Sequence, residues 1–333
     1  MAERVKVGVF GASGYAGLDL MEILVAHPNV QLVFASSNTY AGEFAPRTDL
    51  RYVPSEEADL QSADMVFLAL PHKTSAQFAR KSVDAGLKVV DLSADLRIAN
   101  PNVYEQWYNK HPHPELLPVP YGLPEMHRDE IKSANVVAAP GCYATTTLLG
   151  LYPLLQAHGL ELTAPIIVDA KSGVSGAGRV PTDRTHFVEV YGNLTPYNTG
   201  RSHRHIGEIE QEINKYGEYG TPLIFTPHML PVDRGLMASL YVTLGYNLSG
   251  DKVHSLFTNV YADEPLVQVL PPNENATLRH AVRTNKCVIS IQPVTEQIVY
   301  ITSVTDNLRK GASSQAVQCF NLMYDFPETM GLL

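Results

Sequence analysis

The first part of the chain alternates between short apolar runs and segments with helical spacing of apolar residues. Residues 18–26 and 75–85 show the helical spacing, and each is followed by a proline or a glycine that ends it. This alternation predicts an α/β fold with a Rossmann-type, doubly wound parallel sheet that has helices on both faces. Runs typical of buried parallel strands occupy residues 5–10, 30–35, 64–70, 87–92 and 135–138.

The pattern changes at residue 142, after which longer strand-like runs are separated by long connections. This part predicts an α+β domain with a mixed or antiparallel sheet. Residues 99–130, which are rich in proline and aromatic residues, predict an ordered but irregular excursion. Helix patterns occupy residues 145–155, 205–216, 251–261 and 313–324, and strand patterns occupy residues 164–170, 222–226, 238–244, 287–292 and 298–304.

Composition and charge narrow the class of protein. The chain has 333 residues, enough for two domains, with 45% hydrophobic and 18% charged residues, as in ordinary globular proteins. A formal net charge of −9 argues against a nucleic-acid binder but still allows a small anionic substrate. No apolar run reaches the ~18 residues that span a bilayer, and no signal peptide is recognisable. We expect a cytoplasmic protein without membrane contact, although an organelle enzyme whose transit peptide is missing would look the same.

A glycine-rich turn follows the first strand pattern and precedes a helix. Glycines at 11, 14 and 17 let backbone N–H groups approach a pyrophosphate at a helix N-terminus, so the turn predicts dinucleotide binding. The alternative is a purely structural βα turn. The second strand ends in Ser36 and Ser37 without the acid that grips an NAD ribose, which favours NADP, and Arg47 is a candidate cation nearby.

Cys142 stands after Pro140-Gly141, at the start of a predicted helix. A helix N-terminus stabilises a thiolate, which is the nucleophilic form of cysteine. The alternative is a small buried residue, which is the interpretation we favour for Cys287 and Cys319. The sparse, odd number of cysteines excludes a disulfide framework.

Two histidines, His203 and His205, precede a predicted helix and are the best acid/base candidates. Because they are two residues apart, we expect one of them to face the cysteine. A zinc pair is a weaker alternative, since no third ligand has suitable spacing, and we predict no metal. A second glycine-rich run, residues 171–179, ends in Arg179 and can approach a cofactor or substrate, or else is a mobile loop.

These motifs together resemble the N-acetyl-γ-glutamyl-phosphate reductase family, which is related to aspartate-semialdehyde dehydrogenase. The resemblance runs nearly end to end, and the PGCYAT and SGVSGAGR blocks are its most specific parts. The blocks are GASGYAG at 11–17, FLALPH at 67–72, DLSADLR at 91–97, YGLPE at 121–125, APGCYATT at 139–146, SGVSGAGR at 172–179, HRHIGEIEQE at 203–212, FTPHMLPVDRG at 225–235 and TDNLRKGASSQAVQ at 305–318.

The resemblance implies roles for particular residues. Cys142 would be the acylated nucleophile, and His205, in preference to His203, the acid/base. Members usually carry an arginine or lysine after the second strand, where this chain reads SSNTYAGE. The implied NADP(H) ligands are Gly11, Ser13, Gly14, Tyr15, Ala16, Gly17, Ser36, Ser37, Ser172, Gly173 and Asn307, and the implied substrate ligands are Arg97, Arg179 and Tyr197.

The resemblance also implies an organisation and a reaction. Residues 1–141 with 307–333 would form the NADP-binding domain, and residues 142–306 the catalytic domain, whose sheet would build a homodimer or homotetramer. The implied reaction is NADPH-dependent reduction of N-acetyl-γ-glutamyl phosphate through a cysteine thioester, in arginine biosynthesis. Alternatives are the same chemistry on carrier-bound aminoadipyl phosphate or on aspartyl phosphate, and a non-catalytic dinucleotide sensor on the same fold.

Overall fold

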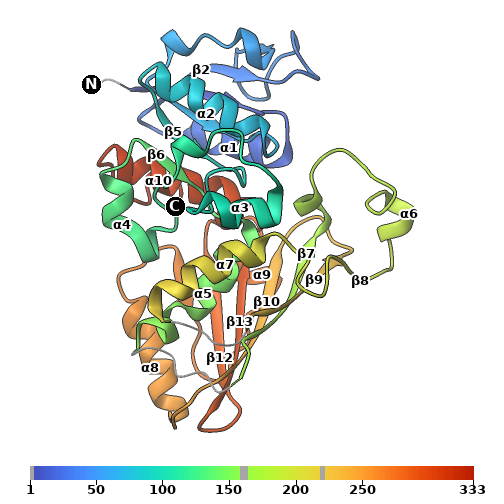
Figure 1. Ribbon diagram of the computed structural model, residues 1–333, viewed down its shortest axis with the longest axis vertical. Helices are drawn as coiled ribbons and strands as arrows, with labels where there is room; N and C mark the ends of the chain where they lie inside the picture. Colours follow the sequence, from blue (N-terminus) through green and yellow to red (C-terminus); the bar gives the residue numbers. More distant parts are fainter. Residues whose placement is uncertain (1–3, 158–163, 218–221) are drawn as a thin grey trace. The chain divides into compact units, whose positions relative to one another are not determined.

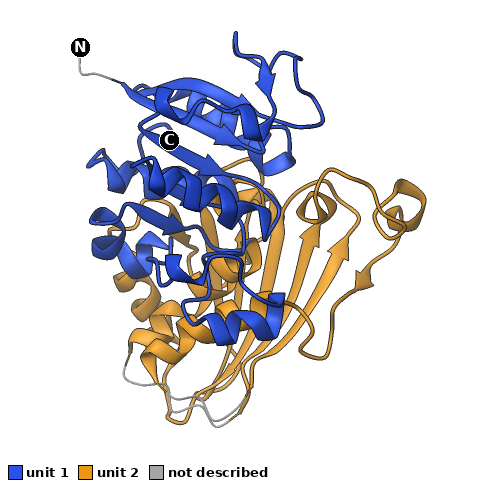
Figure 2. Ribbon diagram, turned by 45° about the horizontal axis from the view of Figure 1, so that its top comes forward, with its two compact units in different colours: residues 1–141, 312–333 blue, residues 142–311 orange. Residues whose placement is uncertain are grey.

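The computed structural model describes residues 4–157, 164–217 and 222–333. The chain divides into two compact units, which Figure 2 colours separately: residues 1–141 with 312–333 form unit 1, and residues 142–311 form unit 2. The predicted domain boundary at residue 307 lies a few residues before the division between residues 311 and 312. None of the helices within the described ranges has the length and apolar character needed to cross a bilayer.

Unit 1 contains a six-stranded sheet in which every pairing is parallel, in the order β3-β2-β1-β4-β5-β6 (Figure 1). The five predicted strands are confirmed, and β3, of only two residues, is too short for a periodicity to predict it. The order reverses between β1 and β4, which is where doubly wound sheets bind ligands. The strands are β1 (Val5–Phe10), β2 (Val30–Ser36), β3 (Tyr52–Val53), β4 (Met65–Leu68), β5 (Lys88–Asp91) and β6 (Val136–Ala138).

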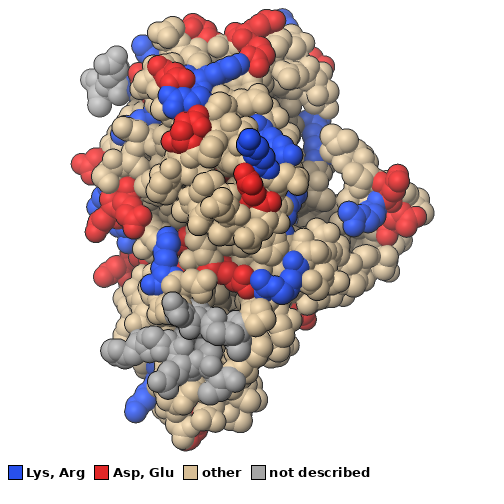
Figure 3. Space-filling model, in the orientation of Figure 1, with Lys and Arg blue, Asp and Glu red and all other residues tan. Residues whose placement is uncertain are grey.

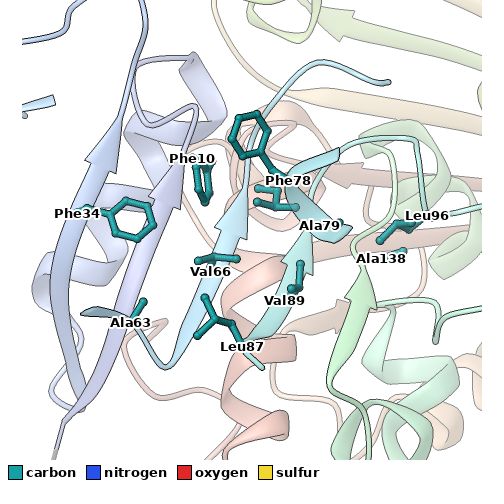
Figure 4. Packing of buried hydrophobic residues seen from close by; sticks show 11 residues of the cluster. Phe10, Phe34, Ala63, Val66, Phe78, Ala79, Leu87, Val89, Leu96 and Ala138 are labelled. Carbon is teal, nitrogen blue, oxygen red and sulfur yellow. The ribbon is translucent and has the colours of Figure 1, made fainter. Parts of the chain in front are cut away.

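Aromatic side chains pack on both faces of this sheet. The ring of Phe78, from α2, lies 4.8 Å from that of Phe10 on one face, as Figure 4 shows. Neighbouring strand residues point to opposite faces, and on the second face Phe320 of α10 lies 5.9 Å from Phe67. Helices therefore cover both faces, as predicted. The helices of unit 1 are α1 (Tyr15–Ala26), α2 (Thr74–Asp84), α3 (Pro101–Tyr108), α4 (Pro124–Lys132) and α10 (Ser314–Met323), with short 3₁₀ turns at Ser55–Glu57, Leu60–Ser62 and Pro114–Leu116.

The prediction that residues 99–130 are irregular is wrong in part, because they contain α3 and most of α4. Pro101 and Pro124 stand at the first positions of these helices, where a missing N–H costs nothing and a fixed φ favours the helix. The side chain of Asn100 caps α3 by accepting from the Asn102 N–H. These two prolines thus begin helices, whereas the many prolines of the segment led us to predict an irregular structure.

Unit 2 contains a seven-stranded sheet in the order β11-β12-β13-β10-β7-β9-β8. Two of its pairings, β7 with β9 and β11 with β12, are parallel and the others are antiparallel, so the predicted mixed sheet is confirmed. The strands are β7 (Ile167–Gly173), β8 (Thr195–Pro196), β9 (Ile224–Leu230), β10 (Leu236–Thr243), β11 (Val267–Val269), β12 (Cys287–Pro293) and β13 (Ile298–Thr305).

The helix α5 packs closely on the middle of this sheet. A Cβ at Gly150 would lie 2.9 Å from Leu240 of β10 and 3.1 Å from Ser303 of β13, so only glycine allows this approach. Nearly all of α5 is buried, although Pro153 lies inside it. The helices of unit 2 are α5 (Cys142–Gln156), α6 (Phe187–Val190), α7 (His205–Ile213), α8 (Gly250–Val260) and α9 (Leu278–Ala281), with 3₁₀ turns at Val174–Ala177 and Asn214–Tyr216 and a π-helical turn at Arg309–Ser313.

A buried polar network holds the segment after β5 in unit 1. Asp91 accepts from the hydroxyls of Ser75 and Ser93 and from the Ser93 N–H, and is fully buried. Asp95, also buried, accepts from the Tyr104 hydroxyl and from two backbone N–H groups at the start of α2. Burial raises the pKa of Asp91 to about 6, and the nearby Asp95 acts in the same direction, while the bonds from Ser75 and Ser93 oppose it.

This network predicts a pH dependence of stability. A raised folded-state pKa means that the folded protein binds more protons than the unfolded chain between pH 4 and 6, so stability falls as the pH rises through that window. Relative to Asp91→Asn, we expect the wild type to lose roughly 2 kcal/mol of unfolding free energy between pH 4 and 7. Urea titrations at both pH values measure the difference, with Glu43→Gln as an exposed control. Parallel pH dependences of wild type and Asp91→Asn would contradict the assignment.

Candidate active site

The glycine turn of unit 1 forms a tight corner between β1 and α1. Gly11 has φ +69°, and a Cβ there would lie 2.3 Å from the Ala69 carbonyl oxygen. A Cβ at Gly17 would lie 2.3 Å from the Gly11 carbonyl oxygen, so both positions require glycine. Within the described ranges no side chain caps α1 at Gly14, which leaves its first N–H groups to face an anion. The corner fits a pyrophosphate.

Hydroxyl groups connect this corner to the end of β2. Ser13 Oγ lies 2.7 Å from Ser37 Oγ, and the Gly11 N–H donates to Ser36 Oγ over 3.3 Å. Ser36 also bonds to the Ser55 hydroxyl, and Ser36 and Ser37 are buried. This tip presents hydroxyls and carries no carboxylate, which suits a phosphorylated ribose better than a free diol.

Two arginines lie in the loop between β2 and β3. Arg47 pairs with Glu22 of α1 over 3.2 Å, and both side chains are exposed. The guanidinium of Arg51 stacks over Phe44, 3.9 Å from the ring centroid. The loop therefore supplies positive charge, but the guanidinium of Arg47 is directed to Glu22 of α1 and not to Ser36 and Ser37 at the end of β2.

In unit 2, Cys142 is the first residue of α5 and is partly exposed. The helix dipole at this position favours the thiolate. The Thr146 hydroxyl donates to the Cys142 carbonyl and bonds to Thr305 Oγ1 over 2.7 Å, which ties the first turn of α5 to the end of β13. Cys287 and Cys319 are buried thiols. The hydroxyl of Ser303 lies 3.3 Å from the Cys287 sulfur, and Cys319 donates to the Gly122 carbonyl.

The π-helical turn after β13 lies directly against the cysteine. A Cβ at Gly311 would lie 2.9 Å from Cys142 Cβ and 3.1 Å from the Asp306 carbonyl oxygen. The Gly311 N–H donates to that same carbonyl. Any larger residue at 311 would displace Cys142, so Gly311 helps to position this cysteine.

Two tyrosines stand beside the cysteine. The Tyr197 hydroxyl donates to the Tyr143 hydroxyl over 3.1 Å, and the Tyr143 hydroxyl donates to the His228 carbonyl over 3.3 Å. Burial raises the pKa of Tyr197 to about 12 and also raises that of Tyr143, and charge on Cys142 raises both further. Both phenols are therefore neutral hydrogen-bonding groups near Cys142.

The two histidines differ in their surroundings. His203 is buried among aromatic rings, 5.5 Å from Tyr143 and 5.1 Å from Phe225 between ring centroids. Its Nδ1 accepts from the His205 N–H over 3.2 Å. Burial lowers the pKa of His203 to about 2, with repulsion from His205 and Arg204 acting in the same direction. His203 is therefore neutral, whereas His205, at the start of α7 and 6.0 Å from Tyr143, is partly exposed.

The second glycine-rich segment is fixed at its start. A Cβ at Gly173 would lie 2.8–2.9 Å from the backbone of Arg234. Asn307 bridges this region, because its Oδ1 accepts from the Gly235 N–H and its Nδ2 donates to Ser175 Oγ. The neighbouring Ser172 is buried and forms a hydrogen bond that lowers the pKa of Tyr143. Ser172, Gly173 and Asn307 thus belong to one cluster in unit 2, and their predicted contact with NADP(H) stays a prediction.

The predicted substrate ligands lie in different settings. Tyr197 belongs to the cysteine cluster, while Arg179 stands in an exposed segment of unit 2. In unit 1, Arg97 donates through Nε to the Ala139 carbonyl and through Nη2 to the Leu92 carbonyl, and thereby ties together the ends of β5 and β6. A role of these three residues in substrate binding stays a prediction.

The sequence analysis did not single out several residues of the site. Tyr143 and Gly311 lie within blocks that we recognised, but the reason for each is a contact between distant segments. Asp306 is buried, accepts from the Arg283 N–H and lies 3.5 Å from the Arg234 guanidinium. Arg234 lies in the sequence block at 225–235 and Asp306 in the block at 305–318, and both blocks contributed to the family resemblance. Within the described ranges, no three His, Cys, Asp or Glu side chains are grouped to hold a metal ion.

Comparison with known proteins assigns both units. Residues 6–134 match the family model described as the NAD binding domain of semialdehyde dehydrogenase, and residues 142–307 match its dimerisation domain. The latter description indicates that the chain oligomerises. Among solved structures, aspartate semialdehyde dehydrogenase II from Vibrio cholerae superposes with a TM-score of 0.78 at 20% identity, covering 97% of this chain and 99% of that one. The enzyme from Candida albicans, solved with NADP, gives 0.72 at 15% identity over 97% and 99% of the two chains. These similarities establish the fold.

Similarity in sequence is closer to another group of enzymes. The N-acetyl-gamma-glutamyl-phosphate reductase of Moorella thermoacetica is 42% identical over 342 aligned positions, which cover 98% of each chain. The protein of the same name from Campylobacter jejuni subsp. jejuni is 39% identical, covering 99% of this chain and 98% of its own. Because the similarity extends over whole chains and both domains, this protein belongs to the N-acetyl-γ-glutamyl-phosphate reductase family of semialdehyde dehydrogenase-type oxidoreductases.

Proposed function

We propose that this protein reduces N-acetyl-γ-glutamyl phosphate to N-acetyl-L-glutamate 5-semialdehyde and phosphate with NADPH, a step of arginine biosynthesis. The observation that carries the proposal is a cysteine at the first residue of α5, next to Tyr143, whose ring lies 5.5 Å from that of His203 and 6.0 Å from that of His205, in a chain that matches reductases of this name end to end. A non-catalytic dinucleotide sensor would not need that cysteine cluster. The proposal includes a cytoplasmic location, which rests on the class of biosynthetic enzyme.

Cys142 is the nucleophile of this reaction. Its thiolate attacks the acyl carbon, the new C–S bond forms, and the C–O bond to phosphate breaks, which leaves a thioester. Reduction of the thioester carbonyl would give a thiohemiacetal oxyanion, whose collapse breaks the C–S bond and releases the aldehyde and the thiolate. A thiolate serves both steps because it is a strong nucleophile and a good leaving group, which divides one difficult displacement into two easier ones.

Unit 1 holds the cofactor. The corner formed by Gly11, Gly14 and Gly17 binds the pyrophosphate, together with Ser13, Tyr15 and Ala16, and Ser36 and Ser37 face the ribose phosphate. Bound NADPH supplies the hydride that reduces the thioester carbonyl. Residues 1–141 with 307–333 act as the NADP-binding domain and residues 142–306 as the catalytic domain, with Ser172, Gly173 and Asn307 facing the nicotinamide.

His205 moves the protons. It takes the proton of the Cys142 thiol and gives it to the departing phosphate, and a proton from solvent returns to the thiolate after the aldehyde leaves. His203 cannot do this because burial keeps it neutral. Its Nδ1 instead accepts from the His205 N–H and helps to fix the start of α7. Arg97, Arg179 and Tyr197 bind the small anionic substrate.

Chains assemble into a homodimer or homotetramer through the sheet of unit 2. The register places Ile224, Ile167 and Tyr241 in one row across β9, β7 and β10. All three are exposed, while their neighbours Phe225, Val168 and Leu240 are buried on the opposite face. One face of the sheet therefore offers an apolar row to a partner, as in interfaces that bury an apolar centre.

The nucleophile can be tested together with the reaction. We expect wild-type protein to reduce NADP⁺ with N-acetylglutamate semialdehyde only when phosphate is present, measured by absorbance, and Cys142→Ser to lose this activity while still binding NADPH. Cys287→Ser is the matched control and keeps activity, since Cys287 is a buried strand residue with a hydroxyl neighbour. Activity with aspartate semialdehyde or the aminoadipate analogue alone would retain the mechanism and replace the substrate. Turnover by Cys142→Ser would contradict the assignment.

The two histidines should separate in a pH profile. His205→Asn removes the proton carrier, so kcat should fall by about 10²–10⁴-fold and one limb of the pH profile should disappear. His203→Asn keeps an acceptor for the His205 N–H, so the profile should keep its shape. The pKa of His203, lowered to about 2, leaves that ring uncharged across the assay range. Loss of a limb in His203→Asn, with His205→Asn unchanged, would reverse the two roles.

A further inference from the structure

A fully buried carboxylate of unit 2 has no place in the reaction described above. Charged side chains of both signs are scattered over the face of the molecule that Figure 3 shows, whereas Asp306, directly after β13, has no exposed surface. A buried carboxylate is costly unless hydrogen bonds and an opposite charge compensate for the water that it has lost. The groups that compensate Asp306 therefore show which segments this residue holds together.

One oxygen of this carboxylate fixes the turn that follows β13. Asp306 Oδ1 accepts from the Leu308 N–H over 2.9 Å and from the Arg309 N–H over 3.3 Å, as aspartate side chains commonly do in turns. The carbonyl oxygen of the same residue accepts from the Gly311 N–H over 2.9 Å. The side chain and the backbone of Asp306 thus hold both ends of residues 308–311.

The other oxygen connects this turn to two more segments of unit 2. Asp306 Oδ2 accepts from the Arg283 N–H over 2.7 Å and lies 3.5 Å from Nη1 of Arg234. Arg283 has φ +62°, a left-handed conformation that residues other than glycine rarely adopt, and its N–H is held by this hydrogen bond. Three segments that are far apart in sequence therefore meet at one carboxylate.

The turn that is held in this way lies against Cys142. A Cβ at Gly311 would lie 2.9 Å from Cys142 Cβ and 3.4 Å from Cys142 Cα, so a small shift of the turn changes the position of the cysteine. Thr305, the residue before Asp306, bonds to Thr146 in the first turn of α5. Two contacts thus lead from the carboxylate to the cysteine, the first from Asp306 to Gly311 and the second from Gly311 to Cys142.

We propose that Asp306 is a positioning residue for the nucleophile and that it acts through Gly311. Its two oxygens fix the turn relative to Arg283 and Arg234, and the turn holds Cys142 where its sulfur reaches the acyl carbon. The position of the attacking atom matters because a misplacement of about 1 Å can lower the rate roughly 10²-fold. The inference rests on the proposed role of Cys142 as the nucleophile and does not depend on which acyl phosphate is the substrate.

The variant Asp306→Asn tests this role with a nearly isosteric change. An amide has only one acceptor oxygen, so it cannot accept from both the Leu308 N–H and the Arg283 N–H. We expect kcat for phosphate-dependent reduction of NADP⁺ to fall about 10²-fold, while the Kd of NADPH, which unit 1 holds, changes less than about threefold. Glu212→Gln is the matched control and should keep wild-type kcat, because Glu212 is equally buried in unit 2 but pairs with Lys215.

A double-mutant cycle tests whether Gly311 transmits the effect. Gly311→Ala places a methyl group against Cys142, so it should lower kcat to a similar extent. If Asp306 acts through Gly311, the variant with both substitutions loses little more activity than Gly311→Ala alone. Two independent defects would instead multiply to a loss of about 10⁴-fold, and that result would overturn the proposal.

Asp306→Ser provides a second variant in case the amide prevents folding. Its hydroxyl can still accept from the Leu308 N–H, but it is too short to link the turn to Arg283 as well. We therefore expect the same loss of kcat as for Asp306→Asn, and wild-type kcat in either folded variant would overturn the proposal.

The choice of aldehyde separates this inference from the proposed function. The kcat values are compared with whichever of N-acetylglutamate semialdehyde, aspartate semialdehyde and the aminoadipate analogue the wild type oxidises fastest, so a different substrate leaves the comparison intact. A wild type that oxidises none of the three would overturn the proposed function together with this inference. Wild-type kcat in Asp306→Asn would overturn the inference alone.

Discussion

The position of Cys142 at the first residue of a buried helix constrains the whole of unit 2. The helix dipole can favour the thiolate only if α5 begins at the cysteine, and α5 is held there by its packing on β10 and β13, where Gly150 allows close approach. Thr146 bonds to Thr305, and Gly311 brings the following turn against the thiol. The sheet, the helix and the turn that follows β13 therefore pack together around Cys142.

The surroundings of Cys142 also affect the protonation states of the neighbouring side chains. Burial lowers the pKa of His203 and raises the pKa of both phenols, so all three groups favour their neutral forms. His205, at the start of α7, is partly exposed, which agrees with the proton transfer that we propose for it. In unit 1, the glycine corner leaves backbone N–H groups to bind an anion. The serines at the end of β2 offer hydroxyls without a carboxylate.

The sequence predicted most of the regular strands and helices, because the spacing of apolar residues reflects which side chains are buried. The strands of unit 1, the mixed sheet and the glycine corner all follow from local patterns. The helices α3 and α4 were missed because the many prolines of residues 99–130 led us to predict an irregular segment, whereas Pro101 and Pro124 occupy first-turn positions. The short strands β3, β8 and β11 have no period to detect. The difference between His203 and His205 depends on burial by Tyr143 and Phe225, and the role of Gly311 on its contact with Cys142, which are contacts between segments far apart in sequence.

The central claim is that the reaction passes through an acyl group on Cys142. The most direct test mixes the protein with N-acetylglutamate semialdehyde and NADP⁺ in the absence of phosphate, and follows a single turnover. The account predicts a burst of NADPH equal to the number of active chains, together with an added N-acetylglutamyl group on the peptide that contains Cys142, seen by mass spectrometry and released by phosphate. Steady NADPH formation without phosphate, or a burst with an unmodified Cys142, would contradict it.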